Sequence, residues 1–225
     1  MHVKYKVLVD IKRRKFKIKI ISSEEVLIYS PYKLTNKEAE AVINSNLNKI
    51  NEIISKMNIF KPIEISKREF LYILGEKVPL KIVKWEANKL QLNYNKEEII
   101  ISMNKNIKEE ELRSFVKVWY KKIAKNYLIN LTAELARKNN FEINNVRVKD
   151  VKTRWGSCSS KRNINLNYKI IMAPKEVIEY VIIHELCHLK QMNHSEKFWK
   201  EVSNILPNYK MQLEHLKKFG HDYEI

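Results

Sequence analysis

Three of the six histidines of this 225-residue chain, His184, His188 and His194, lie within eleven residues. With Glu185, the first two form an H-E-x-x-H pattern inside the largely apolar segment 180–189. Residues four apart lie one turn above each other on the same face of an α-helix, so both imidazoles project to one side. This feature constrains the fold most, because it requires a helix here that ends before His194.

The spacing is typical of a zinc site. Two imidazoles on one helix face can both reach Zn²⁺ at about 2.0–2.1 Å, and a catalytic zinc needs a third protein ligand and an open position. His194 is the main candidate for the third ligand, and Glu214 on a later helix is the alternative. Glu185 lies one position round the helix from His184, where it can act as general base without being a ligand.

The chain must reverse its direction between His188 and His194 to bring the third imidazole back to the metal. We expect Asn193 to end the first helix, because asparagine tolerates the left-handed backbone conformation that terminates helices. Asn193 and Glu196 also fit a capping pair for the next helix, which would place His194 in its first turn.

A segment of alternating residues precedes the H-E-x-x-H helix. Ile164, Leu166 and Tyr168 alternate with polar residues, which predicts a strand over 164–170 with one packed face. At a cleft edge such a strand binds an extended peptide by adding it to the sheet; the alternative is an ordinary structural strand. Gly156 is expected to permit a tight turn before this strand.

The other segments alternate between strand and helix patterns and predict an α+β fold. We expect a β-rich N-terminal region over 1–104 and a second region over 105–225 that carries the active-site helix, with the boundary near Met103–Asn106. Capping patterns at Thr35–Glu38 and Asn106–Glu109 open two helices, and Gly220 ends the last one. Further strands are expected over 5–10, 16–21, 26–29, 70–74, 80–85, 89–94, 99–102 and 146–152, and helices over 35–57, 106–138, 174–192, 195–206 and 209–219.

Composition bears on partners and compartment. Lys and Arg number 43 against 26 Asp and Glu, a formal net charge of +17, which favours anionic partners such as nucleic acid. A general drift toward Lys, Ile and Asn would produce the same charge without a binding function. Cys158 and Cys187 are too few for a disulfide framework and indicate inert thiols. No signal-like or membrane-spanning apolar run is present, so we expect a cytoplasmic protein with no membrane partner.

The run TRWGSCSSKRNINLNYKIIMAP (Thr153–Pro174), followed by HELCHLKQMNHSEKFW, resembles the YgjP-like metallopeptidase domain, a family related to the SprT-like and WLM zincin peptidases. The resemblance is specific over about 145–216 and implies a zincin-like catalytic region. It implies that His184, His188 and His194 are the zinc ligands and Glu185 the catalytic base. The histidine spacing also matches metzincins, but their glycine is Gln191 here and no counterpart of their Met-turn is found.

The expected function is therefore a zinc-dependent metallopeptidase acting on a peptide or protein substrate. Two alternatives remain open: a metal-dependent nucleotide pyrophosphohydrolase, or a basic nucleic-acid-associated protein with a structural metal or a DNA-linked protease activity. The first lacks a glycine-rich phosphate cradle and has an atypical ligand set for Mg²⁺. The donor that would stabilise an oxyanion is not fixed by the sequence; the candidates are Tyr168, Tyr180, His215 and Arg154.

Overall fold

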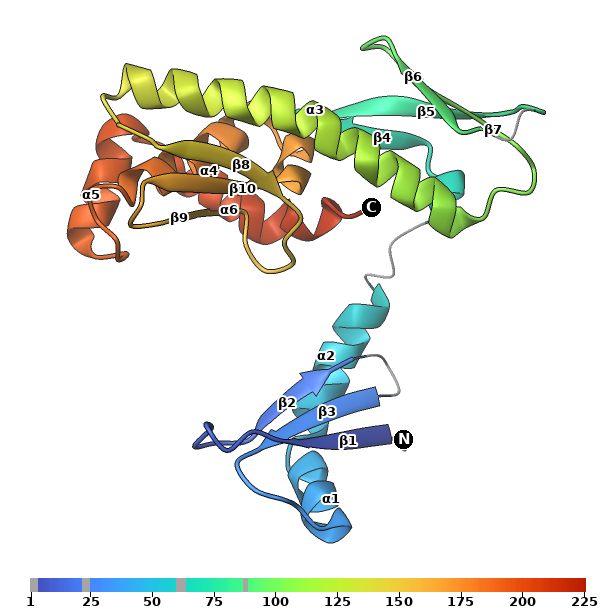
Figure 1. Cartoon of the computed structure of the whole chain (residues 1–225), viewed down its shortest axis with the longest axis vertical. Coiled ribbons are helices and arrows are strands. Elements are labelled where there is room, and N and C mark those ends of the chain that lie inside the picture. The colour runs from blue at the N-terminus through green and yellow to red at the C-terminus, as the bar shows by residue number, and fades with distance from the viewer. Residues whose placement is uncertain (1–3, 22–24, 60–63, 87–88) are drawn as a thin grey trace. The chain divides into compact units, whose positions relative to one another are not determined.

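The computed structural model describes residues 4–21, 25–59, 64–86 and 89–225. The chain forms two compact units, an N-terminal unit of Met1–Lys61 and a C-terminal unit of Pro62–Ile225, each with its own hydrophobic core. Helices and strands are mixed in both units (Figure 1), which confirms the expected α+β class. Among the described residues, no helix combines the length and the apolar character needed to cross a membrane.

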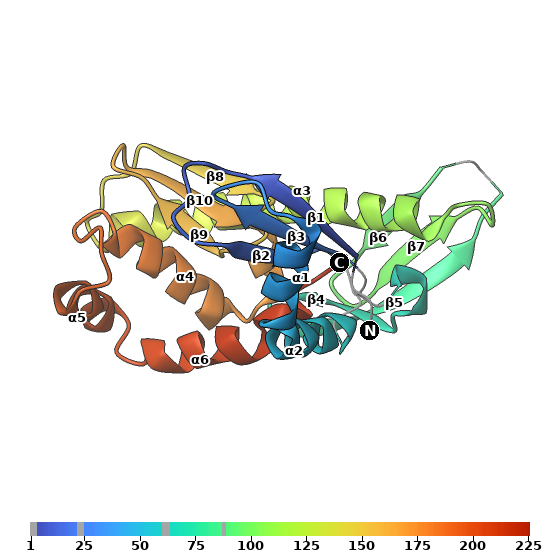
Figure 2. The same cartoon turned by 90° about the horizontal axis from the view of Figure 1, so that it is seen from below.

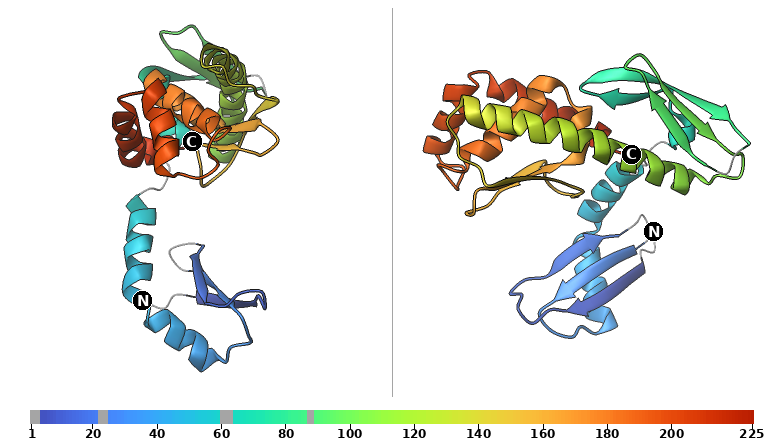
Figure 3. Two further views of the ribbon diagram at one scale, coloured as in Figure 1. Left: turned by 90° about the vertical axis from the view of Figure 1, so that its left-hand side faces the viewer. Right: turned by 45° about the horizontal axis from the view of Figure 1, so that its top comes forward.

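The N-terminal unit is a sheet with two helices on one face (Figure 3, left). β3 lies in the centre of the sheet, parallel to β1 and antiparallel to β2. The buried side chains between sheet and helices are Val26, Ile28, Ala39, Ile43, Ile50 and Ile54. The elements are β1 (Lys4–Val9), β2 (Lys17–Ile20), β3 (Glu25–Ser30), α1 (Asn36–Asn44) and α2 (Leu47–Ile59).

The helix expected over 35–57 is two helices, although the capping box at its start is confirmed. Thr35 and Glu38 bond reciprocally at the beginning of α1. The break follows from two polar side chains, since Ser45 Oγ and Asn46 Nδ2 both donate to the carbonyl of Val42, at 3.0 and 2.8 Å. Such bonds compete with the helical backbone ladder and favour its termination.

The C-terminal unit contains a long helix, two sheets and a group of shorter helices (Figure 2). One sheet has the order β4-β5-β7-β6 and the other β8-β10-β9. The elements are η1 (Ile65–Lys67), β4 (Phe70–Ile73), β5 (Glu76–Lys84), β6 (Gln91–Tyr94), β7 (Ile99–Met103), α3 (Glu109–Lys138), β8 (Asn145–Lys149), β9 (Gly156–Cys158), β10 (Asn163–Asn167), η2 (Tyr168–Met172), α4 (Lys175–Cys187), α5 (Glu196–Ile205), α6 (Tyr209–Phe219) and η3 (Gly220–Asp222).

The boundary expected near Met103–Asn106 falls inside the C-terminal unit, because the chain divides after Lys61. Strands on the N-terminal side of the expected boundary and the helix after it share one core: Leu71 of β4 and Ile99 of β7 belong to the same cluster as Leu112 of α3. Apolar strand faces that need α3 for burial cannot form a separate unit without it.

The start of α3 differs from the expected Asn106–Glu109 capping pair. The helix begins at Glu109, and the residue that caps it, Lys108, makes no side-chain cap. The Glu109 carboxylate instead accepts hydrogen bonds from the backbone amides of Ile65 and Ser66, the second at 3.3 Å. It therefore ties η1 to the beginning of α3.

α4 lies at the centre of the C-terminal unit and contacts α3, α5, α6, β9 and β10. The segment before it holds the β4–β5 turn, since the amide of Leu74 donates to the carbonyl of Ile171 at 2.8 Å. Gly75 in this turn has φ of +87°, and a Cβ there would lie 2.8 Å from the Cα of Pro174. Glycine is therefore required both by the backbone and by the contact.

Candidate active site

The structure brings the three histidines of the 184–194 segment together. His184 lies in α4, and His188 is the residue that follows the helix, still in helical conformation with φ of −64° and ψ of −17°. His194 comes just before α5. One ring nitrogen from each of the three lies within 4.8 Å of the others. Glu214, the alternative third ligand, is instead an exposed residue that pairs with Lys217 at 2.8 Å.

The chain reverses by a route that differs from the expected one. α4 ends at Cys187, and the turn after it is closed by a bond from the amide of Gln191 to the carbonyl of Cys187 at 3.0 Å. Asn193 is not among the residues with positive φ, so it does not supply a left-handed stop. Ser195 occupies the cap position of α5, which leaves His194 outside the helix rather than in its first turn.

The surroundings of His184 and His188 favour the neutral ring that metal binding requires, and for His188 they also fix the tautomer. The Nδ1 atom of His184 is buried and has no hydrogen-bond partner among the described residues. His188 Nδ1 lies 2.9 Å from the carbonyl oxygen of Gln191. A carbonyl only accepts, so Nδ1 carries the proton and Nε2 keeps its lone pair for a metal. Burial lowers the pKa of His184 to about 3, helped by repulsion from His188 and His194. Burial also lowers the pKa of His188. Neutral rings are the form that binds a cation.

The distances fit one small ion. The two Nε2 atoms of His184 and His194 face each other at 3.0 Å. Tetrahedral zinc with nitrogen ligands at about 2.0–2.1 Å places those ligands about 3.3 Å apart. At this distance the two nitrogens either share one proton or repel each other, and a bound cation would take the place of that proton. His184, His188 and His194 are therefore suited to hold a divalent metal ion.

Two aromatic residues of α5 support the rings and were not singled out from the sequence. Phe198 is fully buried and stacks on His188, with ring centroids 4.4 Å apart and an angle of 26° between the planes. Trp199 stacks on His194 with centroids 5.7 Å apart. Helical spacing would not have found them, since His194 lies outside α5; the available signal is that two aromatic residues stand in the first turn of the helix that follows the third histidine.

Glu185 is 6% exposed and lies beside β9, from which the backbone amide of Cys158 donates to its carboxylate. Burial raises the pKa of Glu185 to about 7, while the nearby charge of Arg154 and the Cys158 amide oppose the rise. Gly156 was expected to allow a tight turn, but its role here is close approach. A Cβ at Gly156 would lie 2.6 Å from both Cγ and Oε1 of Glu185.

The three histidines and Glu185 line a common cavity of about 550 Å³. The other lining residues are Arg154, Trp155, Gly156, Ser157, Cys158, Tyr180, Val181, Met192, Leu213, Leu216 and Lys217.

Of the four candidate oxyanion donors, Tyr180 and Arg154 belong to this lining. Tyr168 is buried elsewhere, with Lys121 5.5 Å from its ring centroid, and the ring of His215 contacts the hydroxyl of Tyr223 at 2.6 Å. The cavity therefore has an apolar wall and a few polar groups near the histidines and Glu185.

Of the two roles considered for the strand before the helix, β10 has the structural one, and the edge strand is β9. β10 is the central strand of its sheet and pairs with β8 and β9 on its two sides. It has no free edge at which to receive a peptide. β9 is an edge strand, and Gly156, Ser157 and Cys158 all line the cavity. The edge available next to Glu185 is therefore that of β9.

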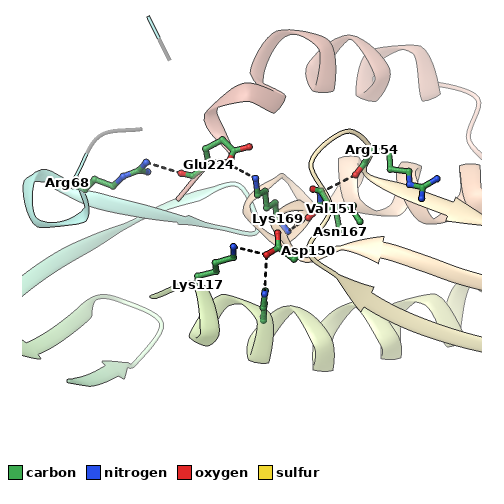
Figure 4. A network of polar contacts seen from close by, with 9 residues as sticks. Arg68, Lys117, Asp150, Val151, Arg154, Asn167, Lys169 and Glu224 are labelled. Atoms are coloured by element: carbon green, nitrogen blue, oxygen red, sulfur yellow. Dashed lines mark hydrogen bonds and ion pairs between the residues drawn. The ribbon is translucent and has the colours of Figure 1, made fainter. Parts of the chain in front are cut away.

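Asn167, at the end of β10, holds the loop that enters β9 (Figure 4). Its Nδ2 donates to the carbonyls of Val151 and Arg154, at 2.8 and 3.1 Å. Its Oδ1 accepts from the amide of Lys169 at 3.2 Å, which starts η2 and ends the strand earlier than expected. One buried side chain thus positions the residues that lead to Gly156.

Both cysteines are free thiols in the structure. Cys187 is buried, and burial raises its pKa to about 12. Cys158 is partly buried beside Glu185, and burial raises its pKa to about 11. Thiols with raised pKa values stay protonated near neutral pH and are poor nucleophiles.

Comparisons with known proteins bear on the same site. The profile of the family described as YgjP-like, metallopeptidase domain, matches residues 14–219. No curated protein matches the chain. Among solved structures, the chain is similar to the metallopeptidase zymogen of Pyrococcus abyssi abylysin, with 26% identity and a TM-score of 0.37 over 40% of this chain and 93% of that chain.

A second similar structure is the metallopeptidase zymogen of Methanocaldococcus jannaschii jannalysin, with 26% identity and a TM-score of 0.36 over 40% of this chain and 95% of that chain. The family match extends much further, across well over half of the chain and into both units. The chain therefore belongs to the YgjP-like metallopeptidase family and is a metal-dependent peptidase.

Proposed function

We propose that this chain is a zinc-dependent peptidase that hydrolyses peptide bonds in the cavity beside α4. His184, His188 and His194 bind the metal, and Glu185 is the general base. The observation that carries the proposal is the convergence of three imidazole nitrogens and one buried carboxyl group on a single cavity. No other combination of groups described above joins a cation site to a proton acceptor.

The ligand set favours zinc. Three imidazoles with one position left open are typical of catalytic zinc, whereas Mg²⁺ and Ca²⁺ prefer oxygen ligands. A zinc ion in such a site supplies Lewis acidity and lowers the pKa of water toward about 7. The Gln191 carbonyl and the stacked Phe198 ring fix the orientation of His188, so its Nε2 is directed before the ion arrives.

Glu185 takes the proton of the attacking water and returns it to the nitrogen of the leaving amine. A carboxyl group suits both steps when its pKa is near the working pH, and burial raises that of Glu185 to about 7. The charge of a bound cation lowers this pKa again, which favours the basic form before attack. The Cys158 amide orients the carboxylate, and Gly156 leaves room for it.

The edge of β9 supports binding of an extended peptide. β9 pairs with β10 on one side, and the described residues contain no strand on its other side. A peptide that adds to this edge forms main-chain hydrogen bonds that do not depend on its sequence. Selectivity then comes from the cavity, where Trp155, Met192 and Leu213 favour an apolar side chain.

The test is metal analysis together with hydrolysis of an unfolded protein by the full chain. We expect Glu185→Gln to keep the wild-type zinc stoichiometry and to lose activity by on the order of 10³-fold. His194→Ala should lose zinc, whereas His215→Ala, a histidine outside the cluster, should keep both zinc and activity.

Three results would contradict the proposal. Full activity of Glu185→Gln would exclude its role as base, and unchanged zinc content of His194→Ala would move the third ligand elsewhere. Release of pyrophosphate from a nucleoside triphosphate, without new peptide termini from protein substrates, would indicate a nucleotide hydrolase.

A further inference from the structure

The second face of the N-terminal sheet carries a different chemistry from the helix-covered face. α1 and α2 bury Val26 and Ile28 of β3 against their own apolar side chains. Successive side chains of a strand point to opposite faces, so the alternate residues Leu27 and Tyr29 lie on the other face. This face of β1, β3 and β2 is called the outer face below.

The strand register places lysines on both sides of Leu27 and on one side of Tyr29. Leu27 pairs with Lys6 on β1 and Lys19 on β2, and Tyr29 pairs with Lys17 on β2. Lys6, Lys17 and Lys19 are exposed, whereas Leu27 and Tyr29 are partly exposed. On the same face Glu25 of β3 lies 3.9 Å from Lys6, and the exposed Leu8 of β1 lies opposite Tyr29. The outer face is therefore a short apolar and aromatic centre with Lys17 and Lys19 along one side and Lys6 on the other.

The connection from β1 to β2 extends this basic surface. It carries Lys12, Arg13, Arg14 and Lys15 and crosses the end of β3 where Tyr29 lies. Arg13 Cζ is 5.4 Å from the ring centroid of Tyr29, and its Nε pairs with Asp10 at 2.9 Å. Residues 4–21 carry eight Lys and Arg and one acidic residue, so the surface has a strong positive potential.

Tyr29 is the aromatic ring of the outer face. Phe16, although 42% exposed, lines a cavity with Ile18 and Ile20 of β2 and Ile50 of α2, so it lies on the helix-covered side, where its ring meets that of Tyr32 edge to face with centroids 5.9 Å apart. Lysines alone would suit any polyanion. Cations grouped around the partly exposed ring of Tyr29 suit an anion that also offers flat aromatic groups, which is the chemistry of phosphates and unpaired bases.

We propose that the outer face of the N-terminal unit binds single-stranded nucleic acid. Phosphates lie against Lys6, Lys17, Lys19 and the turn over 12–15, and a base stacks on Tyr29. A duplex is a poorer fit, because its bases are stacked on one another and cannot reach a ring on a flat sheet. This binding site is separate from the cavity beside α4 and does not depend on the proposed hydrolysis.

The charge part of the proposal is tested by fluorescence anisotropy of the full chain with a labelled single-stranded oligonucleotide of about 20 nucleotides, at a series of salt concentrations. Binding should weaken as the salt concentration rises, and log Kd should depend linearly on the logarithm of the salt concentration. Lys17→Glu with Lys19→Glu should weaken it by about tenfold or more and reduce the slope by about 1.4, because two phosphate contacts are lost.

The matched control is Lys122→Glu with Lys125→Glu on the exposed side of α3, which changes the net charge by the same amount. It should bind within about twofold of wild type with an unchanged slope. Hydrolysis of an unfolded protein should be unaffected by either pair, since none of these lysines lines the cavity.

The stacking part is tested by Tyr29→Ala and Tyr29→Phe. The alanine variant should bind about tenfold more weakly with the same salt slope, and the phenylalanine variant should bind like wild type. Amide hydrogen exchange over β3 shows whether Tyr29→Ala has kept the sheet. If it has not, Tyr29→Leu, which keeps an apolar side chain without the ring, replaces it in the comparison.

Several outcomes would overturn the proposal. One is no binding at about 50 mM salt, where electrostatic contacts are strong. Another is equal loss in the α3 control, which would assign the effect to overall charge. Tighter binding of a duplex than of the single strand would assign the face to duplex nucleic acid. Displacement by polyglutamate, combined with no effect of Tyr29→Ala, would assign it to an acidic protein.

Discussion

The cavity beside α4 and the outer face of the N-terminal sheet differ in how their polar groups meet water. Glu185 and His188 are 6% and 9% exposed, and each is held by a backbone group. Lys6, Lys17 and Lys19 are exposed side chains on strands whose opposite side forms a core. Buried groups need neighbours that replace water, whereas exposed groups need only a strand that points them outward. Substitutions in the cavity should therefore disturb neighbouring residues and the stability of the unit, whereas substitutions on the outer face should affect only the substituted positions.

The largest effect is expected for Phe198→Ala. Phe198 is fully buried against His188, so its loss removes apolar contact and leaves a cavity, at a cost of about 3–5 kcal/mol in the free energy of unfolding. All four tryptophans lie after residue 61, so their fluorescence during urea denaturation reports on the C-terminal unit. Phe219→Ala, at a 38% exposed phenylalanine, is the control and should cost far less. Equal costs would remove the contrast between buried and exposed positions.

Gly156→Ala should reduce hydrolysis by about 100-fold, which corresponds to about 2.7 kcal/mol in the barrier. The new Cβ would lie 2.6 Å from the Glu185 carboxylate and displace it, while the zinc content should stay the same. Gly220→Ala is a comparison rather than a neutral control, because its Cβ would meet the side chain of the cavity residue Trp155 at 3.0 Å; it should affect KM more than kcat, since it leaves Glu185 in place. Wild-type activity of Gly156→Ala would show that the position of the carboxylate is not critical.

Asn167→Ala should destabilise the C-terminal unit by about 2 kcal/mol, because the carbonyls of Val151 and Arg154 lose their donor. Activity should fall as well, since those residues lead into β9. Asn165→Ala is a useful comparison: its Nδ2 bonds to Ser157 Oγ at 3.2 Å, and it is only partly buried. A cost for Asn167→Ala no greater than that of Asn165→Ala would show that the loop is positioned by other contacts.

The smallest effect is expected on the outer face. Lys17→Glu with Lys19→Glu should change the free energy of unfolding by less than about 0.5 kcal/mol, because neither side chain is buried. Amide hydrogen exchange in β3 measures this, since the tryptophans do not report on the N-terminal unit. A large loss of protection would mean that these lysines contribute to the sheet itself, and the contrast between the regions would fail.

Local patterns predicted much of the C-terminal region. Residues four apart on a helix share a face, so the convergence of His184 and His188 follows from spacing alone. The placement of His194 nearby also followed, because the short turn permits few routes. The turn itself was misjudged: Asn193 has no left-handed conformation, and the carbonyl of Gln191 is held by His188 instead. The hydrogen bond of the His188 side chain across the turn therefore outweighs the intrinsic preference of Asn193 for the left-handed conformation.

Other features depend on residues far apart in the sequence. Gly156 was assigned to a turn because nothing in its neighbourhood indicates Glu185, 29 positions later. Strand order also depends on distant residues. Alternation identifies β10 as a strand, but only its pairing with other strands shows that it is central and that β9 is at the edge. The boundary after Lys61 also depended on pairing, since β4 to β7 share a core with α3.

By itself the sequence determined the α+β class, the helix that carries His184 and Glu185, and the alternating strands of the N-terminal unit. These are set by backbone periodicity, which acts over a few residues. Only the tertiary structure decided which strand edge adjoins the Glu185 carboxyl, which rings support the histidines and where the units divide. Those depend on which apolar faces find partners for burial, and that choice is made by the whole chain.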